Sequence, residues 1–197
     1  MNTTRTAAPV PQGQGGERLP LPPADHLTDD QRAVMQDLVN GPRKGVYGPF
    51  IPLLRQPKLL ERVAQLGEVL RFGGSLPADV RELVTSTVAS HVANQFEWVM
   101  HVPLAQAAGV PADALEAIRV GQAPSGLGAA QQAASDFTAE LLLHHEVSDA
   151  VYQRAAAAFG EEGVVELGTL IGYFAMVSWV MNVARTPSRP TADVTPL

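Results

Sequence analysis

The chain has 197 residues, a length that suits one domain with short tails, and 46% of them are apolar, which is enough to build a core. Its formal net charge of −6 argues against a nucleic-acid partner, because binding a phosphate backbone needs a basic surface. It contains no cysteine, which excludes disulfides, thiolate nucleophiles and cysteine-ligated metals.

The two ends of the chain differ in composition from the part between them. Residues 1–23 contain five prolines and a glycine-rich patch, and residues 186–197 contain three more prolines. Such segments bury too little apolar surface to offset the entropy of ordering, so both are predicted to be disordered tails. A single helical domain is expected over residues 24–185. No apolar run near the N-terminus resembles a signal peptide, so a cytoplasmic location is expected.

Between the tails, the apolar periodicity predicts an all-α domain. The first helix is expected from a cap at Thr28 to about Asn40, and a long loop rich in glycine and proline follows over residues 41–57. Later helices are predicted to begin near Leu59, Pro77 and Pro111, and to cover about 128–144, 149–159 and 163–184.

The most apolar segment runs from Leu167 to Val183, 17 residues without a formal charge. A membrane-spanning helix needs about 20 residues, and this segment has no flanking basic cluster. Because it is apolar on nearly every face, it is expected to be surrounded by protein, in the core of the domain or in a subunit contact. No membrane partner is predicted.

Glu97 and His101 are the strongest candidates for chemistry. Four residues apart on a helix, they share a face, and a carboxylate that holds an imidazole prepares it for general acid–base catalysis. Asn94, one turn before Glu97, is a candidate for orienting a substrate carbonyl or carboxylate. His91 and Trp98 are further candidates for substrate binding.

The same residues also have a purely structural interpretation. Asn94 followed by Glu97 fits a capping box at the start of a helix, and Glu–His pairs at this spacing are common on helix surfaces. A cap at Asn94 requires the preceding helix, which carries Glu82, to end near Ala93. A tight hairpin there would fold Glu82 back to the level of His101 and make a Glu82–His101–Glu97 cluster possible.

The long loop and the isolated Glu–His pair lead to predictions about substrate and cofactor binding. Arg43 and Tyr47 in the loop are candidates for binding an anionic substrate, and a solvated basic loop is the alternative. Helical di-iron proteins use Glu-x-x-His pairs from two helices, whereas this chain has one Glu-x-x-x-His, so no metal and no other cofactor is expected.

The spacing Glu82-x11-Asn94-x2-Glu97-x3-His101 resembles that of the alkylhydroperoxidase D and carboxymuconolactone decarboxylase superfamily. In its peroxidase branch, two cysteines stand where this chain has Asn94 and Glu97, and the other two positions hold proton-relay residues. The resemblance covers roughly residues 27–185.

Other motifs are more similar to the cysteine-free, decarboxylase-like branch of this superfamily. They are EWxxH at 97–101, AxxAG at 105–109, GPF…PLL…P…L at 48–59 and LPADVRE at 76–82. The resemblance implies an AhpD-like helical domain, in which a helical hairpin carries the site. It also implies assembly as a trimer or hexamer, with sites near the subunit contacts.

Together, the residues and the resemblance lead to two functional hypotheses. The first is a cofactor-free lyase or isomerase that transfers protons on a small lactone or enolisable carboxylic acid, and not a thiol peroxidase. His101 would move the proton, and Glu97 or Glu82 would orient the imidazole of His101. Asn94 would stabilise an oxyanion. The alternative is a non-catalytic small-molecule-binding or assembly protein on the same oligomeric scaffold. The enzyme hypothesis requires Glu97 and His101 to line a pocket.

Overall fold

The computed structural model of the chain describes residues 16–189, 191 and 193–197. Within these residues the chain forms helices and connecting segments and no strand, which confirms the all-α prediction for the described part. The elements in chain order are η1 (Ala24–His26), α1 (Asp29–Asn40), α2 (Phe50–Leu53), α3 (Pro57–Glu68), η2 (Val69–Gly73), α4 (Ala78–His91), α5 (Gln95–Ala107), α6 (Ala112–Arg119), α7 (Ala129–His144) and α8 (Asp149–Ala184).

Capping residues and prolines set most of the helix starts. Thr28 caps α1: its hydroxyl accepts from the Gln31 N–H, and the Gln31 side chain accepts from the Thr28 N–H. Pro57 lies in the first turn of α3, while Pro77 and Pro111 immediately precede α4 and α6. These starts agree with the sequence-based predictions.

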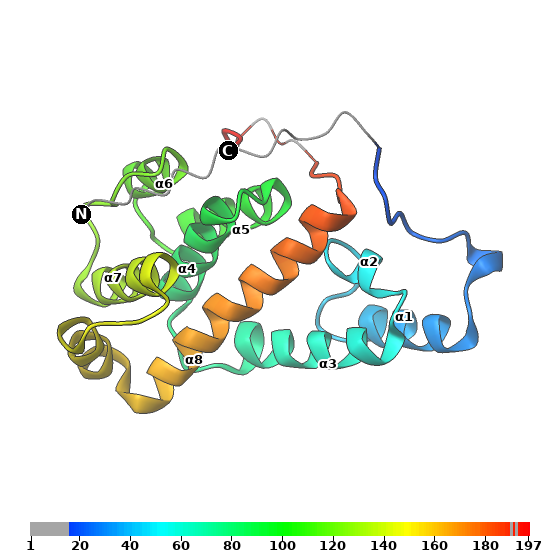
Figure 1. Cartoon of the computed structure of the whole chain (residues 1–197), viewed down its shortest axis with the longest axis horizontal. Helices are drawn as coiled ribbons and strands as arrows, with labels where there is room; N and C mark the ends of the chain where they lie inside the picture. The colour runs from blue at the N-terminus through cyan, green and yellow to red at the C-terminus, as the bar shows by residue number, and fades with distance from the viewer. Residues whose placement is uncertain (1–15, 190, 192) are drawn as a thin grey trace.

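The helices pack in two groups around α4 and α8. α4 contacts α5, α7 and α8, and α8 also contacts α7 and the short α2, while α1 and α3 lie at the other end of the molecule (Figure 1). The main core contains Leu60, Val84 and Leu170, which are fully buried. A second cluster, around Leu83 and Trp98, fills the space between α4, α5 and α6. α4 therefore has a core on two sides, and side chains from its middle turns are buried.

α8 combines the last two predicted helices in one 36-residue element. Gly160 interrupts it with a φ of 70° and a ψ of 174°, between the two segments predicted from the sequence. α8 is long and apolar enough to cross a membrane by length and composition alone, but half of its most apolar window is buried against the rest of the chain. It contributes Leu167, Leu170 and Phe174 to the main core.

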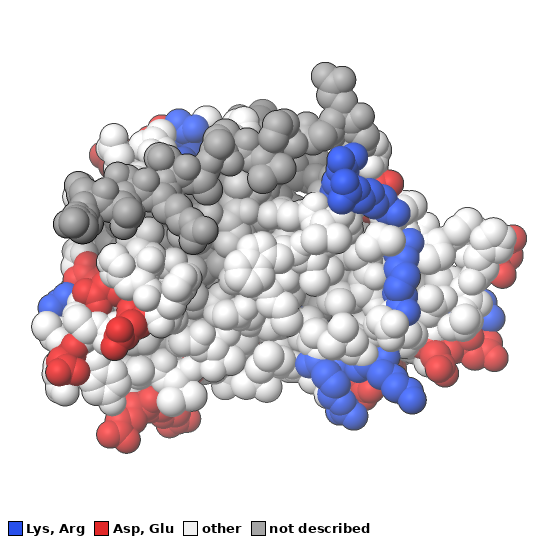
Figure 2. Space-filling model, viewed as in Figure 1, with Lys and Arg blue, Asp and Glu red and all other residues white. Residues whose placement is uncertain are grey.

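Among the described residues, none covers one face of α8. Val165, Trp179 and Val183 are 70%, 59% and 63% exposed. The surface over the middle of the molecule carries few charged side chains (Figure 2). The described residues thus leave this face of the helix open, and the expected cover by a subunit contact stays a prediction.

The segments predicted as tails contact the domain where the structure describes them. Residues 1–15 of the N-terminal tail lie outside the described residues. Beyond them, the Arg18 N–H donates to the Ala184 carbonyl, 2.8 Å away. At the other end, Val194 is 6% exposed and the Trp98 indole N–H donates to the Thr195 carbonyl at 2.9 Å. These contacts involve mainly backbone groups of the two segments, which composition cannot reveal.

Candidate active site

Two carboxylates flank the imidazole of His101. Its Nδ1 lies 2.6 Å from Oε2 of Glu82, and its Nε2 lies 3.1 Å from Oε2 of Glu97. All three residues are between 4% and 6% exposed. The geometry therefore brings together the three residues that the sequence singled out for catalysis.

The cluster depends on the hairpin between α4 and α5. The chain turns at Ala93, which has a φ of 51°, and the Asn94 N–H donates to the Ala89 carbonyl. The Asn94 side chain then caps α5 by accepting from the Glu97 N–H at 2.8 Å. Because the bend lies at the predicted position, Glu82 on α4 returns to the level of His101 on α5.

The surroundings of His101 favour its charged form. Burial disfavours the imidazolium, but hydrogen bonds and charges from Glu82 and Glu97 outweigh it, so the pKa of His101 lies above its ordinary value of 6.5. Burial alone would raise the pKa of Glu82, but the hydrogen bond to His101 and the nearby charges of His101 and Arg81 hold this pKa below 4.5. When the ring is protonated, each of its nitrogens faces a carboxylate oxygen.

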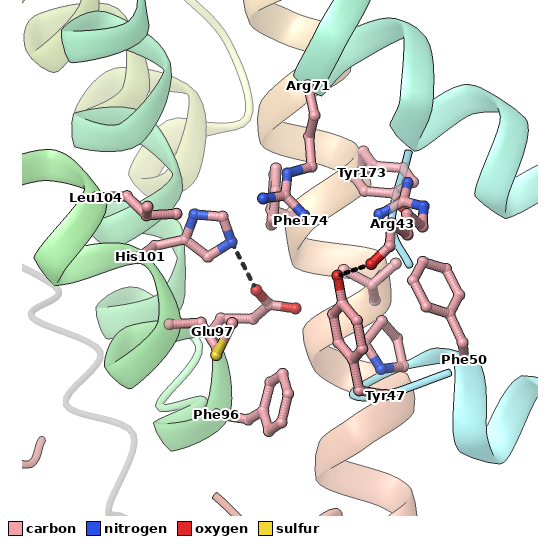
Figure 3. A pocket seen from close by; sticks show the side chains of 13 residues that line it. Arg43, Tyr47, Phe50, Arg71, Phe96, Glu97, His101, Leu104, Tyr173 and Phe174 are labelled. Carbon is pink, nitrogen blue, oxygen red and sulfur yellow. Dashed lines mark hydrogen bonds and ion pairs between the residues drawn. The ribbon is translucent and has the colours of Figure 1, made fainter. Parts of the chain in front are cut away.

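A pocket lies beside this cluster, and Glu97 is the acidic group that faces it. In Figure 3 the Glu97 carboxylate points into the pocket from α5, and the His101 ring lies behind it. Both ring nitrogens of His101 are engaged by carboxylates, whereas Oε1 of Glu97 has no hydrogen bond to a described residue. The remaining lining residues are Arg43, Tyr47, Pro49, Phe50, Arg71, Phe96, Met100, Leu104, Tyr173, Phe174 and Val177.

Arg43 and Tyr47 line the pocket, and the loop that carries them is folded against α3. The Arg43 side chain is buried, stacks 4.5 Å over the Phe50 ring and donates from Nη2 to the Ala64 carbonyl. The Tyr47 hydroxyl donates to the Arg43 carbonyl at 3.2 Å. The alternative interpretation, a basic loop exposed to solvent, therefore does not hold for Arg43.

Three predicted substrate-binding residues lie away from the pocket. Asn94 is 2% exposed, and its amide nitrogen donates to the Ser178 carbonyl and to the Asn182 side chain of α8. Trp98 is buried in the second cluster, and His91 is exposed at the end of α4. Helix capping and distant partners account for Asn94 and Trp98, so neither side chain is free to bind a substrate.

Arg71 and Tyr173 also line the pocket, and neither is among the predicted site residues. Arg71 lies in the π-helical turn η2, which continues α3, and such turns often occur at functional sites. Tyr173 comes from α8, and its hydroxyl lies next to the Arg43 guanidinium in the space left by Gly67. Gly67, a glycine in the interior of an amphipathic helix, was the one sequence signal that other groups approach α3 closely here.

We expect Gly67→Ala to disturb this wall of the pocket. A Cβ at this position would lie 2.1 Å from the Tyr173 hydroxyl and 2.5 Å from Nη2 of Arg43. An alanine in an open helical position raises stability by about 1 kcal/mol, but here the steric overlap should outweigh that gain. Thermal unfolding should therefore show a lower Tm for Gly67→Ala.

Gly168→Ala is the matched control, because Gly168 is also helical and has no atom near its Cβ position. This variant should keep or raise the Tm. If the Tm of Gly67→Ala rises as much as that of the control, the side chains of Tyr173 and Arg43 move aside without cost, which would contradict the prediction.

A family model matches the middle of the chain. Residues 57–140, from the start of α3 into α7, match the model of the Carboxymuconolactone decarboxylase family. This segment contains all three residues of the buried cluster. No curated protein matches the whole sequence significantly.

Solved structures share the fold at low sequence identity. An uncharacterized peroxidase-related protein from Ralstonia eutropha JMP134, described as an alkylhydroperoxidase AhpD core, superposes with a TM-score of 0.68 at 20% identity, covering 92% of this chain and 95% of that one. A peroxidase-related protein from Silicibacter sp. TM1040 gives 0.66 at 19% identity, covering 90% and 93%. The debrominase Bmp8 gives 0.67 at 13% identity, covering 90% and 94%. These similarities confirm an AhpD-like fold.

Proposed function

Residues 57–140 match the model of the carboxymuconolactone decarboxylase family, and on this premise we propose that the protein is a cofactor-free lyase or isomerase. Its substrate would be a small lactone or enolisable carboxylic acid, on which it transfers a proton at carbon. The observation that carries the proposal is the Glu97 carboxylate, which faces a pocket and is hydrogen-bonded from behind by His101. We place the protein in the cytoplasm.

We assign the proton transfer to Glu97, which faces the pocket, and a supporting role to His101. For an isomerase, Glu97 removes a proton from a carbon next to a carbonyl, the electron pair moves into the carbonyl as an enolate, and Glu97 returns the proton to another carbon. For a lyase, breaking the bond to a carboxylate releases carbon dioxide and leaves the same enolate, which takes a proton from the Glu97–His101 pair. This differs from the sequence-based hypothesis, in which His101 itself acts on the substrate.

His101 and Glu82 would stabilise the charges that this cycle creates. The imidazolium stabilises the Glu97 carboxylate by a hydrogen bond, and Glu82 fixes the orientation of the ring through Nδ1. Because both ring nitrogens of His101 are engaged by carboxylates, the ring has no free nitrogen to offer a substrate. Glu82 and His101 are therefore positioning residues in this proposal.

The alternative is a small-molecule-binding protein that has the scaffold and no reaction. One observation favours it: the cluster satisfies itself, with both nitrogens of His101 bound to carboxylates. A buried ion network of this kind can have a purely structural role. The two proposals differ in what happens to a bound ligand, since only the enzyme changes it.

Carbon dioxide release from γ-carboxymuconolactone, followed by mass spectrometry, is the first test of the reaction. The wild-type protein should release carbon dioxide, and the Glu97→Gln variant should not. Tight binding of lactones and keto acids without turnover of any of them would favour the binding protein. A thiol-dependent peroxidase reaction is not open to this chain, which has no cysteine.

We also propose that the protein is a homo-oligomer assembled through α8. The exposed positions Val165, Thr169, Gly172, Met176, Trp179 and Val183 recur every three or four residues without a charge. A stripe with this 3.5-residue period is typical of a helix that pairs with another helix. Light scattering should give a mass well above the 20.9 kDa of one chain.

Trp179→Glu should lower that mass, because it places a charge in the middle of the stripe. Leu143→Glu is the control, since Leu143 is 64% exposed but lies at the end of α7. A monomeric wild-type protein would contradict the proposal.

A further inference from the structure

We propose that Arg71, with Arg43 and the Tyr173 hydroxyl beside it, forms an anion subsite that holds the carboxylate of the substrate. This inference rests on the proposed function and deepens it, because it assigns a binding partner to the charged end of the substrate. The three residues come from η2, from the loop after α1 and from α8, and all line the same pocket as Glu97 (Figure 3).

Arg71 is a cation of the proposed subsite whose side chain is open to a ligand. Its guanidinium lies 5.3 Å from the centre of the Phe72 ring, and among the described residues it has no hydrogen bond and no ion-pair partner. The π-helical turn that carries it ends α3 next to the pocket, and Figure 3 shows the side chain reaching toward Phe174. An arginine in a pocket wall without a protein acceptor is well placed to receive one from a ligand.

Arg43 provides a second, fixed cation. Its guanidinium is held by the Phe50 ring and by the bond from Nη2 to Ala64, and its Nε has no hydrogen-bond partner among the described residues. The nearest carboxylate oxygen, on Glu68, is 3.9 Å from Nε, beyond hydrogen-bond distance. Burying an arginine with donors left open costs free energy, which a ligand acceptor would recover.

The Tyr173 hydroxyl completes the wall as a neutral donor. Burial raises its pKa above the ordinary value of 10.0, although the charge of Arg43 opposes this rise. The phenol therefore keeps its proton at neutral pH. Gly67 leaves the space in which this hydroxyl and Arg43 meet, so the sequence of α3 accommodates the pair.

The charges around the pocket leave room for one carboxylate. Glu82 is balanced by His101 and Arg81, and Glu68 lies nearest to Arg43. The carboxylates in and next to the pocket lining are Glu68, Glu82 and Glu97. The cations, with His101 as imidazolium, are Arg43, Arg71, Arg81 and His101, so the cations exceed the carboxylates by one. A ligand carboxylate neutralises this excess, and its two oxygens match the planar fork of an arginine.

The subsite would also direct the reaction. A carboxylate held by Arg71 and Arg43 would leave the rest of a small substrate in the pocket that Glu97, Phe96 and Phe174 line. Fixing one end of the substrate makes the approach of the other end to Glu97 effectively intramolecular. The same cations would stabilise the negative charge of an enolate.

The test is a calorimetric titration of the full chain with benzoate, a carboxylate that has no proton to lose at the neighbouring carbon, and with benzamide, its uncharged analogue. Wild-type protein should bind benzoate at least about tenfold more tightly than benzamide. Arg71→Gln should lower the benzoate affinity by at least about tenfold and leave benzamide unchanged, while Arg71→Lys should recover part of the loss. Arg62→Gln, a substitution of an exposed arginine on α3, is the matched control and should bind like the wild type.

Two results would overturn the subsite: equal affinity for benzoate and benzamide, or an undiminished benzoate affinity in Arg71→Gln. Absence of saturable benzoate binding by the wild type would overturn it as well. Glu97→Gln separates this inference from the proposed function, because it should still bind benzoate. Benzoate binding that depends on Arg71, in a protein without turnover, would support the subsite and refute the enzyme.

Discussion

Glu97→Gln should lower the turnover number by about 10²- to 10⁴-fold, the usual contribution of a general acid–base group. The amide keeps the size of the side chain and can still accept a hydrogen bond from His101, but it cannot accept a proton from carbon. Steady-state rates on a substrate turned over by the wild type provide the measurement. The KM should change much less than the turnover number.

Glu116→Gln is the control for this substitution, because Glu116 is a half-exposed carboxylate on α6 that pairs with Arg119 outside the pocket. It should keep the wild-type rate. A Glu97→Gln variant that retains its rate within about threefold would contradict a catalytic role for Glu97.

His101→Ala should destabilise the fold by about 3–5 kcal/mol at neutral pH, the cost of removing one partner from a buried ion pair. The variant leaves Glu82 and Glu97 buried near each other without the cation between them, and Arg81, 3.4 Å from Glu82, compensates only one of them. Urea unfolding of both proteins measures the difference. His26→Ala, which removes an exposed histidine, should leave the free energy of unfolding unchanged.

The pH dependence of stability provides a second readout on the same two proteins. Because the pKa of His101 is raised in the folded state, its stabilisation is complete below pH 6.5 and is lost as the pH rises through the folded-state pKa. Because the pKa of Glu82 is lowered, its contribution is present above pH 4.5 and is lost as the pH falls through the folded-state value. The alkaline decrease should be absent from His101→Ala, and an identical decrease in both proteins would contradict the assignment.

The fold could be predicted to a large extent because its determinants are local. Thr28, Pro77 and Pro111 mark helix starts through capping and proline geometry, and Gly160 breaks α8 between the two predicted helices. The exposed face of α8 could not be predicted. Apolar periodicity shows that a helix needs cover, but it does not distinguish cover by the same chain from cover by another.

The cluster of Glu82, Glu97 and His101 could be predicted for a similar reason. Glu97 and His101 are one helical turn apart, and the cap at Asn94 fixes where the hairpin bends, so the return of Glu82 follows from local rules. The cap also explains why Asn94 lies away from the pocket. Its side chain is tied to Asn182, 88 residues away, and sequence spacing carries no information on such a partner.

The proposed anion subsite of Arg71, Arg43 and Tyr173 could be predicted only in part. Arg43 and Tyr47 stood out as basic and aromatic residues in an unusually long loop. Arg71 lies in a π-helical turn and Tyr173 in a long apolar helix, where sequence patterns favour a solvated charge and a core aromatic residue. Their convergence depends on the packing of α3 against α8, which is a property of the whole fold.

Solvent deuterium incorporation is the most direct test of the central claim that Glu97 transfers a proton at carbon. Small lactones and keto carboxylates, γ-carboxymuconolactone among them, are incubated in D₂O with wild-type protein and with Glu97→Gln, and proton NMR follows the loss of the signal next to the carbonyl. The account predicts exchange above background with the wild type for at least one compound, and background exchange with Glu97→Gln. Exchange at the same rate with both proteins, or none above background with the wild type for compounds that it binds, would contradict it.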